Sequence, residues 1–99
     1  MGKIQLKITP SFASILGVKN YNWLNVEKEI GAETTIRDLL TDLALNNPGF
    51  RKIIFEPDTG KLSQILITLN GSLLQVPDVT SVKLNDGDSV IITPAYEGG

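Results

Sequence analysis

The chain lacks both cysteine and histidine in its 99 residues. Without cysteine, it can form neither a disulfide bond nor a thiolate-ligated zinc site. Without histidine, it lacks the commonest general base, the usual partner of a serine nucleophile and the preferred protein ligand of transition metals. The groups left for chemistry are carboxylates, lysines, hydroxyls and the chain's own terminal carboxylate. We therefore expect no metal site and no catalytic residue in the usual sense.

Basic residues and long apolar runs are also scarce. The formal net charge is −2, and the basic residues are scattered singly apart from Arg51 and Lys52. No cationic stripe is available to neutralise phosphates, which argues against a nucleic-acid partner. No apolar run approaches the roughly 18 to 20 residues that span a bilayer, and the amino terminus alternates charged and apolar residues, unlike a signal peptide. We expect a cytoplasmic protein without a membrane partner.

The composition is that of one small globular domain. Hydrophobic residues make up 41% of the chain and charged residues 20%, which is typical of a soluble fold. A chain of this length can build a single core and is too short for a second domain. The predicted organisation is a folded domain over residues 1–93 and a flexible C-terminal tail over residues 94–99.

Period-two alternation predicts two strands in the first third of the chain, over residues 3–9 and 24–30. Lys28 is the imperfect member of the apolar face of the second strand. Between the strands, we expect a helical turn over residues 12–16. We expect Tyr21 and Trp23 to plug the end of the sheet, although they could instead stack on a ligand.

A change of period then predicts an amphipathic helix over residues 36–44, because apolar residues recur at i, i+3, i+4, i+7 and i+8. Thr35 and Asp38 resemble a capping box, with Thr34 as an alternative cap one residue earlier. The proline and glycine in residues 46–49 cannot continue the helix.

The second half of the chain begins with an apolar patch at residues 50–55 and a turn-rich segment at 56–60, whose carboxylates we expect to be solvated. Asn70 and Gly71 lie between two apolar runs, which predicts a two-residue hairpin turn. Ile65, Ile67 and Leu69 of the first hairpin strand should face the core.

The last strand is expected over residues 90–93, after the acidic segment 85–88. That segment could be mistaken for part of a calcium loop, but the other spaced ligands of such a loop are missing. A tight turn around Gly87 is the better interpretation. The order of elements, with the last strand beside the first, predicts an α+β protein with a β-grasp fold, in which a mixed sheet packs against one main helix.

The chain ends in two glycines. Pro94 ends regular strand pairing, and the five residues beyond it reach at most about 16 to 18 Å when extended. A tail of this length could enter a narrow channel in another protein. Glycine, which has no Cβ, would let the backbone approach a reaction centre closely. Two terminal glycines alone are a weak motif and could be incidental.

The combined features are far more specific, and they resemble the small subunit of molybdopterin synthase, a ubiquitin-like sulfur carrier. The resemblance covers nearly the whole chain and is carried by TTIRDLLTDL, PGFRKIIF, ILITLNG, LNDGDSVIITP and PAYEGG. It implies a ubiquitin-like β-grasp fold and a protein that is a cosubstrate rather than a catalyst.

The resemblance also implies a reaction cycle centred on Gly99. A ubiquitin-activating-type adenylyltransferase would use ATP to adenylate its carboxylate, so this chain would bind no cofactor of its own. A sulfur donor, either a sulfurtransferase or a cysteine desulfurase, would convert the adenylate to a thiocarboxylate. The tail would then enter the active site of the large subunit of molybdopterin synthase and deliver sulfur to the pterin precursor.

The tail matches the family residue by residue, with departures. Gly99 stands at the thiocarboxylate position and Pro94 at the first of two usual prolines, while Ala95 replaces the second. Tyr96 and Glu97 stand where small residues are usual. The residues expected to thread the partner's active site are Pro94, Ala95, Tyr96, Glu97 and Gly98. An apolar patch on the sheet should dock the partner, with Phe12 and Tyr96 as the expected contacts.

Two other functions stay open. A carrier of the same fold could serve thiazole synthesis or transfer-RNA thiolation, or could be conjugated to lysines as a modifier. A β-grasp interaction module with incidental glycines is the second alternative. A small enzyme is disfavoured, because no catalytic constellation is present.

Overall fold

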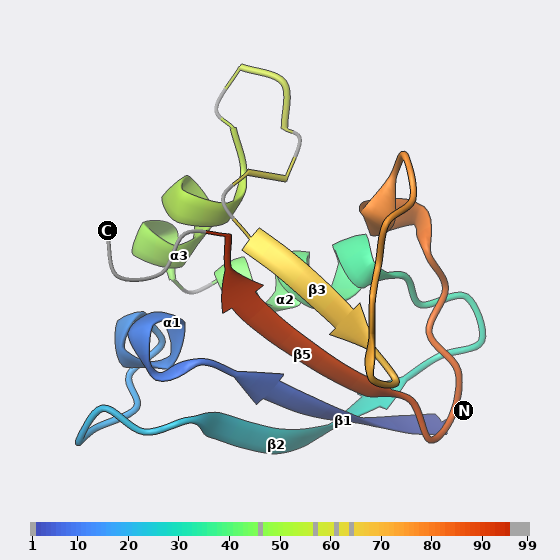
Figure 1. Cartoon of the computed structure of the whole chain (residues 1–99), viewed down its shortest axis with the longest axis horizontal. Coiled ribbons are helices and arrows are strands. Elements are labelled where there is room, and N and C mark those ends of the chain that lie inside the picture. The colour runs from blue at the N-terminus through green and yellow to red at the C-terminus, as the bar shows by residue number, and fades with distance from the viewer. Residues whose placement is uncertain (1, 46, 57, 61, 64, 96–99) are drawn as a thin grey trace.

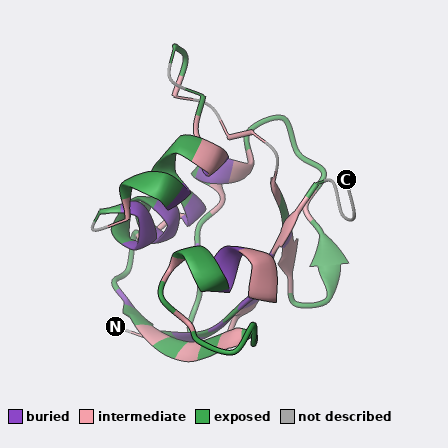
Figure 2. Ribbon diagram, turned by 90° about the vertical axis from the view of Figure 1, so that its left-hand side faces the viewer, coloured by how far each residue is buried: buried purple, intermediate pink, exposed green. Residues whose placement is uncertain are grey.

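The computed structural model describes residues 2–45, 47–56, 58–60, 62, 63 and 65–95, which form a five-stranded mixed sheet with helices on one side (Figures 1 and 2). The strand order is β2-β1-β5-β3-β4. The elements are β1 (Gly2–Ile8), α1 (Pro10–Ile15), β2 (Leu24–Ile30), α2 (Ile36–Ala44), α3 (Pro48–Ile54), β3 (Ile65–Leu69), β4 (Ser72–Leu73), the short 3-10 helix η1 (Val79–Ser81) and β5 (Ser89–Pro94).

The position of β5 defines the topology. β1 and β2 form an antiparallel hairpin, and α2 carries the chain to the other half of the sheet (Figure 1). β5 then enters the centre, parallel to β1 with Leu6 opposite Val90, and antiparallel to β3 with Ile67 opposite Ile92. This arrangement confirms the predicted α+β, ubiquitin-like β-grasp fold.

The core lies between the sheet and the helices. Alternate residues of the central strands point into it, and α2 contributes the apolar stripe that its sequence predicted. Burying each large aliphatic side chain contributes about 1.5 to 3 kcal/mol before entropy is subtracted. The largest fully buried side chains are Ile4, Leu6, Ile8, Ile36, Leu40, Phe50, Ile54, Val90 and Ile92.

The N-terminus of α2 is fixed by a capping box. The hydroxyl of Thr35 accepts a hydrogen bond from the Asp38 backbone amide at 3.3 Å, and the Asp38 carboxylate accepts one from the Thr35 amide at 3.0 Å. Each residue thus satisfies a backbone donor that the helix leaves unpaired. The alternative cap, Thr34, has another role, since its hydroxyl accepts from the Gly31 amide at 2.8 Å.

Two helices differ from the sequence-based expectation. The sequence predicts only an apolar patch where α3 lies, because the apolar residues of this short segment follow a helix stop. Pro48 does stop α2, but it also starts α3, where its fixed φ suits the first helical turn. α1 likewise begins at Pro10, earlier than the turn predicted over residues 12–16.

The β3–β4 hairpin forms as predicted. Asn70 and Gly71 both have positive φ, at 50° and 86°, which is typical of a two-residue turn that follows the twist of the strands. The Asn70 side chain also donates to the Asp88 carboxylate at 2.9 Å and accepts from the Ser89 amide at 2.8 Å. The hairpin turn is therefore tied to the start of β5.

The prediction that Tyr21 and Trp23 plug the sheet end was wrong. Their side chains are 69% and 51% exposed. β2 begins only at Leu24, and the positive φ values of Asn20 and Tyr21, 66° and 51°, turn the preceding loop sharply. Phe12 and Phe50 occupy the core instead.

Candidate functional site

The carboxyl end of β5 is the point from which the predicted tail leaves the domain. β5 is hydrogen-bonded on both sides, to β1 and to β3. Its pairing continues to Pro94, which lies opposite Ile65, so the strand runs one residue further than predicted. Thr9 adds a bond beyond the end of β1, from its amide to the Ile92 carbonyl at 3.2 Å. The base of the tail is therefore anchored in the centre of the sheet.

Ala95 is the last residue that the structure describes, and it is exposed. The other tail residues singled out from the sequence, Tyr96, Glu97, Gly98 and Gly99, lie outside the described residues. The assignment of the Gly99 carboxylate as the reactive group therefore stays a prediction. What the structure adds is the anchored strand end directly before these residues.

The face of the sheet away from the helices carries an apolar patch beside this strand end. Leu66 lies opposite Thr93, near the end of β5, and is 40% exposed. Register continues the patch, since Ile91 lies opposite Thr68, which in turn lies opposite Leu73. We call Leu66, Leu73 and Ile91 the open-face patch.

Sequence reasoning predicted a patch on the sheet without naming these residues. The signal was available, because alternation that turns Ile65 and Ile67 inward must turn Leu66 outward. The same reasoning places Ile91, between two buried residues of β5, on the open face. An apolar residue at an outward position of an otherwise alternating strand marks such a patch.

Phe12, expected at the partner surface, belongs to the core. Its side chain is only 5% exposed, and its ring packs edge-on against Phe50, with ring centroids 5.8 Å apart. The cause is α1, which begins at Pro10 and turns this position toward α3. The Phe12 ring is therefore not exposed on the surface of the described domain, where a partner could contact it.

The acidic segment 85–88 is a tight turn, as predicted. Asp88 donates from its amide to the Asn85 carbonyl at 3.0 Å, and Gly87 has a φ of +88°. The carboxylates of Asp86 and Asp88 accept bonds from the backbone amides of Lys3 and Asn85. Among the described residues, no group of acidic side chains is arranged to hold a metal ion. No helix in the same part of the chain is long and apolar enough to cross a bilayer.

Comparison with known proteins identifies a family whose members match this chain up to its last residue. The model of the ThiS family matches residues 18–99. A search of curated proteins found no match.

Solved structures share the fold. SAMP1 from Haloferax volcanii aligns with a TM-score of 0.74 at 22% identity, covering 99% of this chain and 100% of SAMP1. A putative molybdopterin converting factor, subunit 1, from Pyrococcus furiosus gives a TM-score of 0.70 at 22% identity, with coverage of 97% and 100%. Urm1 from Trypanosoma brucei gives 0.69 at 21% identity, with coverage of 99% and 96%.

Proposed function

Because this chain belongs to the ThiS family of ubiquitin-like sulfur carriers, we propose that it carries sulfur as a thiocarboxylate on Gly99. We further propose that it is the small subunit of a molybdopterin synthase. The observation that supports the carrier role best is that the family match runs through the two terminal glycines, and that the last strand before them, β5, is anchored in the centre of the sheet.

The chemistry requires only the terminal carboxylate from this chain. The carboxylate attacks the α-phosphate of ATP on the activating enzyme, and pyrophosphate leaves. Sulfide supplied by the sulfur donor then replaces AMP on the carbonyl carbon and leaves a thiocarboxylate. Without a side chain, Gly99 leaves its carboxylate free to approach the α-phosphate and its carbonyl carbon open to attack by sulfide. Adenylation and sulfur delivery are catalysed by the partners.

The body of the domain supports this chemistry by positioning the tail. The open-face patch beside the end of β5 offers apolar area for docking. Five residues beyond Pro94 span at most about 16 to 18 Å. A partner that docks on the patch can therefore receive the tail in a channel of that depth. Loss of Leu66 or Leu73 should weaken docking without altering the tail.

The pterin pathway is the favoured recipient of the sulfur. Pro94 is the last residue of β5 and stands at the first of the two prolines usual in the small subunits of molybdopterin synthase that the sequence resembles, and the Pyrococcus furiosus converting factor has the same fold. The shared fold of SAMP1, whose name is small archaeal modifier protein 1, supports a second candidate, a carrier of the same fold that acts as a protein modifier.

Capture experiments distinguish these recipients. The thiocarboxylate form of the full chain is presented separately to the large subunit of molybdopterin synthase, to a thiazole synthase and to a transfer-RNA thiolase. We expect a stable complex and transfer of sulfur with the first. A chain lacking Gly98 and Gly99 is the control and should transfer no sulfur. Transfer to either of the other two enzymes, or an isopeptide bond to lysines, would refute the pterin assignment.

A further inference from the structure

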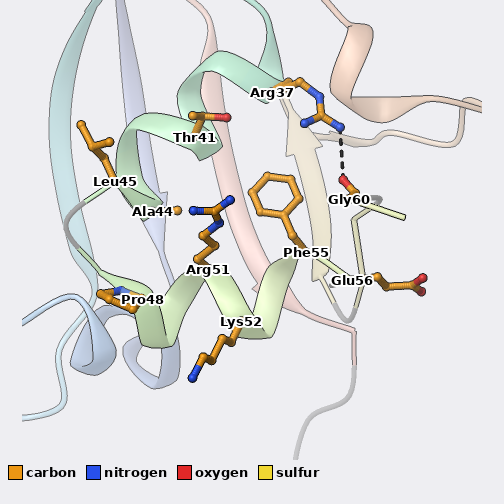
Figure 3. Close-up of a pocket in the computed structure, with 10 residues that line it drawn as sticks. All are labelled: Arg37, Thr41, Ala44, Leu45, Pro48, Arg51, Lys52, Phe55, Glu56 and Gly60. Carbon is orange, nitrogen blue, oxygen red and sulfur yellow. Dashed lines mark hydrogen bonds between the residues drawn. The ribbon is translucent and has the colours of Figure 1, made fainter. Parts of the chain in front are cut away.

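A groove of about 930 Å³ lies between α2 and α3, on the helical side of the molecule (Figure 3). α2 forms one wall with Arg37 and Thr41 of its exposed side and with Ala44 at its end. α3 forms the other wall. Apolar side chains contribute much of the lining: Ala44, Leu45, Pro48 and Phe55.

Both arginines of the chain line this groove. The guanidinium of Arg37 lies 5.6 Å from the centroid of the Phe55 ring and donates a hydrogen bond to the Gly60 carbonyl at 3.2 Å. These contacts hold one charged group over an aromatic face. In Figure 3, the Phe55 ring lies between the side chains of Arg37 and Arg51.

The positive charge of α3 is not neutralised within the described part of the chain. Ion pairs there involve Lys3, Lys28 and Lys83, and no carboxylate pairs with Arg51 or Lys52. The one acidic residue of the lining is Glu56, whose carboxylate accepts a bond from the Thr59 hydroxyl and points away from the groove in Figure 3. In a chain of net charge −2, the groove thus brings together three cations, Arg37, Arg51 and Lys52.

An exposed leucine accompanies these cations. Leu45 is 72% exposed, more than the other large hydrophobic residues of the described chain. An exposed apolar side chain beside unneutralised guanidinium groups suits a ligand that is both apolar and negatively charged. Such a ligand needs an apolar group for the groove and carboxylates for the planar, forked donors of arginine.

We propose that the α2–α3 groove binds an acidic segment of a partner protein, one in which a large apolar side chain is flanked by aspartate or glutamate. Nucleic acid fits poorly, because its dense phosphates would face only three cations on an acidic protein. A second copy of this chain fits poorly as well, since two molecules of net charge −2 repel each other.

The location of the groove has a functional consequence. It lies on the helical side, whereas the open-face patch lies on the opposite side of the sheet. A partner bound in the groove leaves the patch and the end of β5 accessible, so a complex of three proteins can form. The groove thus allows one protein to retain the carrier while a second engages the tail.

The test is selection of random phage-displayed peptides on the immobilised full-length chain. Enriched peptides should carry a leucine or an aromatic residue beside acidic residues. The most enriched peptide is then synthesised with a fluorescent label, and its Kd is measured by anisotropy. The double variant Arg51→Gln/Lys52→Gln, which removes charge-assisted contacts, and the single variant Leu45→Ser, which removes an apolar contact, should each weaken binding by about tenfold.

Two controls isolate the groove. Lys7→Gln/Lys19→Gln makes the same change in net charge at exposed positions elsewhere and should change Kd less than twofold. Deletion of Gly98 and Gly99 should leave binding unchanged, which separates this proposal from sulfur carriage. Circular dichroism and the urea midpoint confirm that each variant is folded.

The proposal is overturned if selection yields no acidic preference, or if the Lys7/Lys19 variant weakens binding as much as the Arg51/Lys52 variant does. It is also overturned if deletion of the glycines abolishes binding. Sedimentation of the free chain as a dimer that Leu45→Ser dissociates would likewise overturn it, because a second copy would then occupy the groove.

Discussion

Thr35 and Asp38 illustrate how single residues fix the fold that supports the tail. Each side chain satisfies the backbone amide of the other at the first turn of α2. Asn70 has a comparable role at the hairpin, where it takes a positive φ and bonds to residues at the start of β5. The capping box and the hairpin turn could both be predicted from local sequence, because each depends on residues that are near neighbours in the chain.

Replacement of Thr35 by alanine should lower the free energy of unfolding by about 1 kcal/mol, the usual cost of losing a helix N-cap. Urea denaturation followed by circular dichroism measures this change. Thr41→Ala is the matched control, because Thr41 is exposed within α2 and alanine favours the helix. An equal loss in both variants would show that the capping box contributes nothing.

At the scale of elements, α1 and α3 account for the sequence-based errors. Both are short helices that begin with proline, a residue that ends one helix as readily as it starts the next. Their apolar residues also lack a long helical period. Phe12 could not be placed from its neighbours, since its burial depends on Phe50, which is distant in the sequence. Tyr21 and Trp23 were misplaced for the same reason, because exposure is decided by tertiary packing.

Replacement of Phe12 by alanine should cost about 3 to 5 kcal/mol of stability, because the edge-on contact with Phe50 is lost and a cavity remains. Ile15→Ala is the control within α1. Its side chain is 39% exposed, so a much smaller loss is expected. Urea midpoints measure both.

A milder variant, Phe12→Leu, tests the corrected assignment of this residue. It should keep the fold, because leucine fills much of the space of the ring with apolar atoms, and it should leave binding of the activating enzyme within about twofold of wild type. A large loss of partner binding at unchanged stability would show that Phe12 contacts the partner after all.

Substitutions in the open-face patch should have the opposite effect to those at Phe12, with a loss of partner binding and little change in stability. Leu66→Thr/Leu73→Thr removes exposed apolar area while threonine keeps the strand preference. Affinity for the activating enzyme or the large subunit should fall about tenfold, with little change in the urea midpoint. Leu45→Ser, on the helical side, is the control and should not affect this affinity. Equal affinities for wild type and the double variant would exclude the patch from docking.

At the scale of the whole molecule, the fold could be predicted because periodicity, turns and order of elements all agree with one topology. The central place of β5 follows from that order. The family match covers β5 and continues through the two terminal glycines. The groove could not be predicted, because Arg37 and Arg51 lie on different helices and line the same groove only in the folded chain. The molecule therefore has two separate surfaces, one beside the strand end and one between the helices.

Intact-mass spectrometry tests the central proposal most directly. The purified chain is incubated with ATP, the activating enzyme and a sulfur donor. The mass should rise by the difference between one sulfur and one oxygen atom, and fragmentation should locate the change at Gly99. A chain without Gly98 and Gly99 should show no increase. An unchanged mass of the intact chain, under conditions in which the same enzymes convert another carrier, would contradict the proposal.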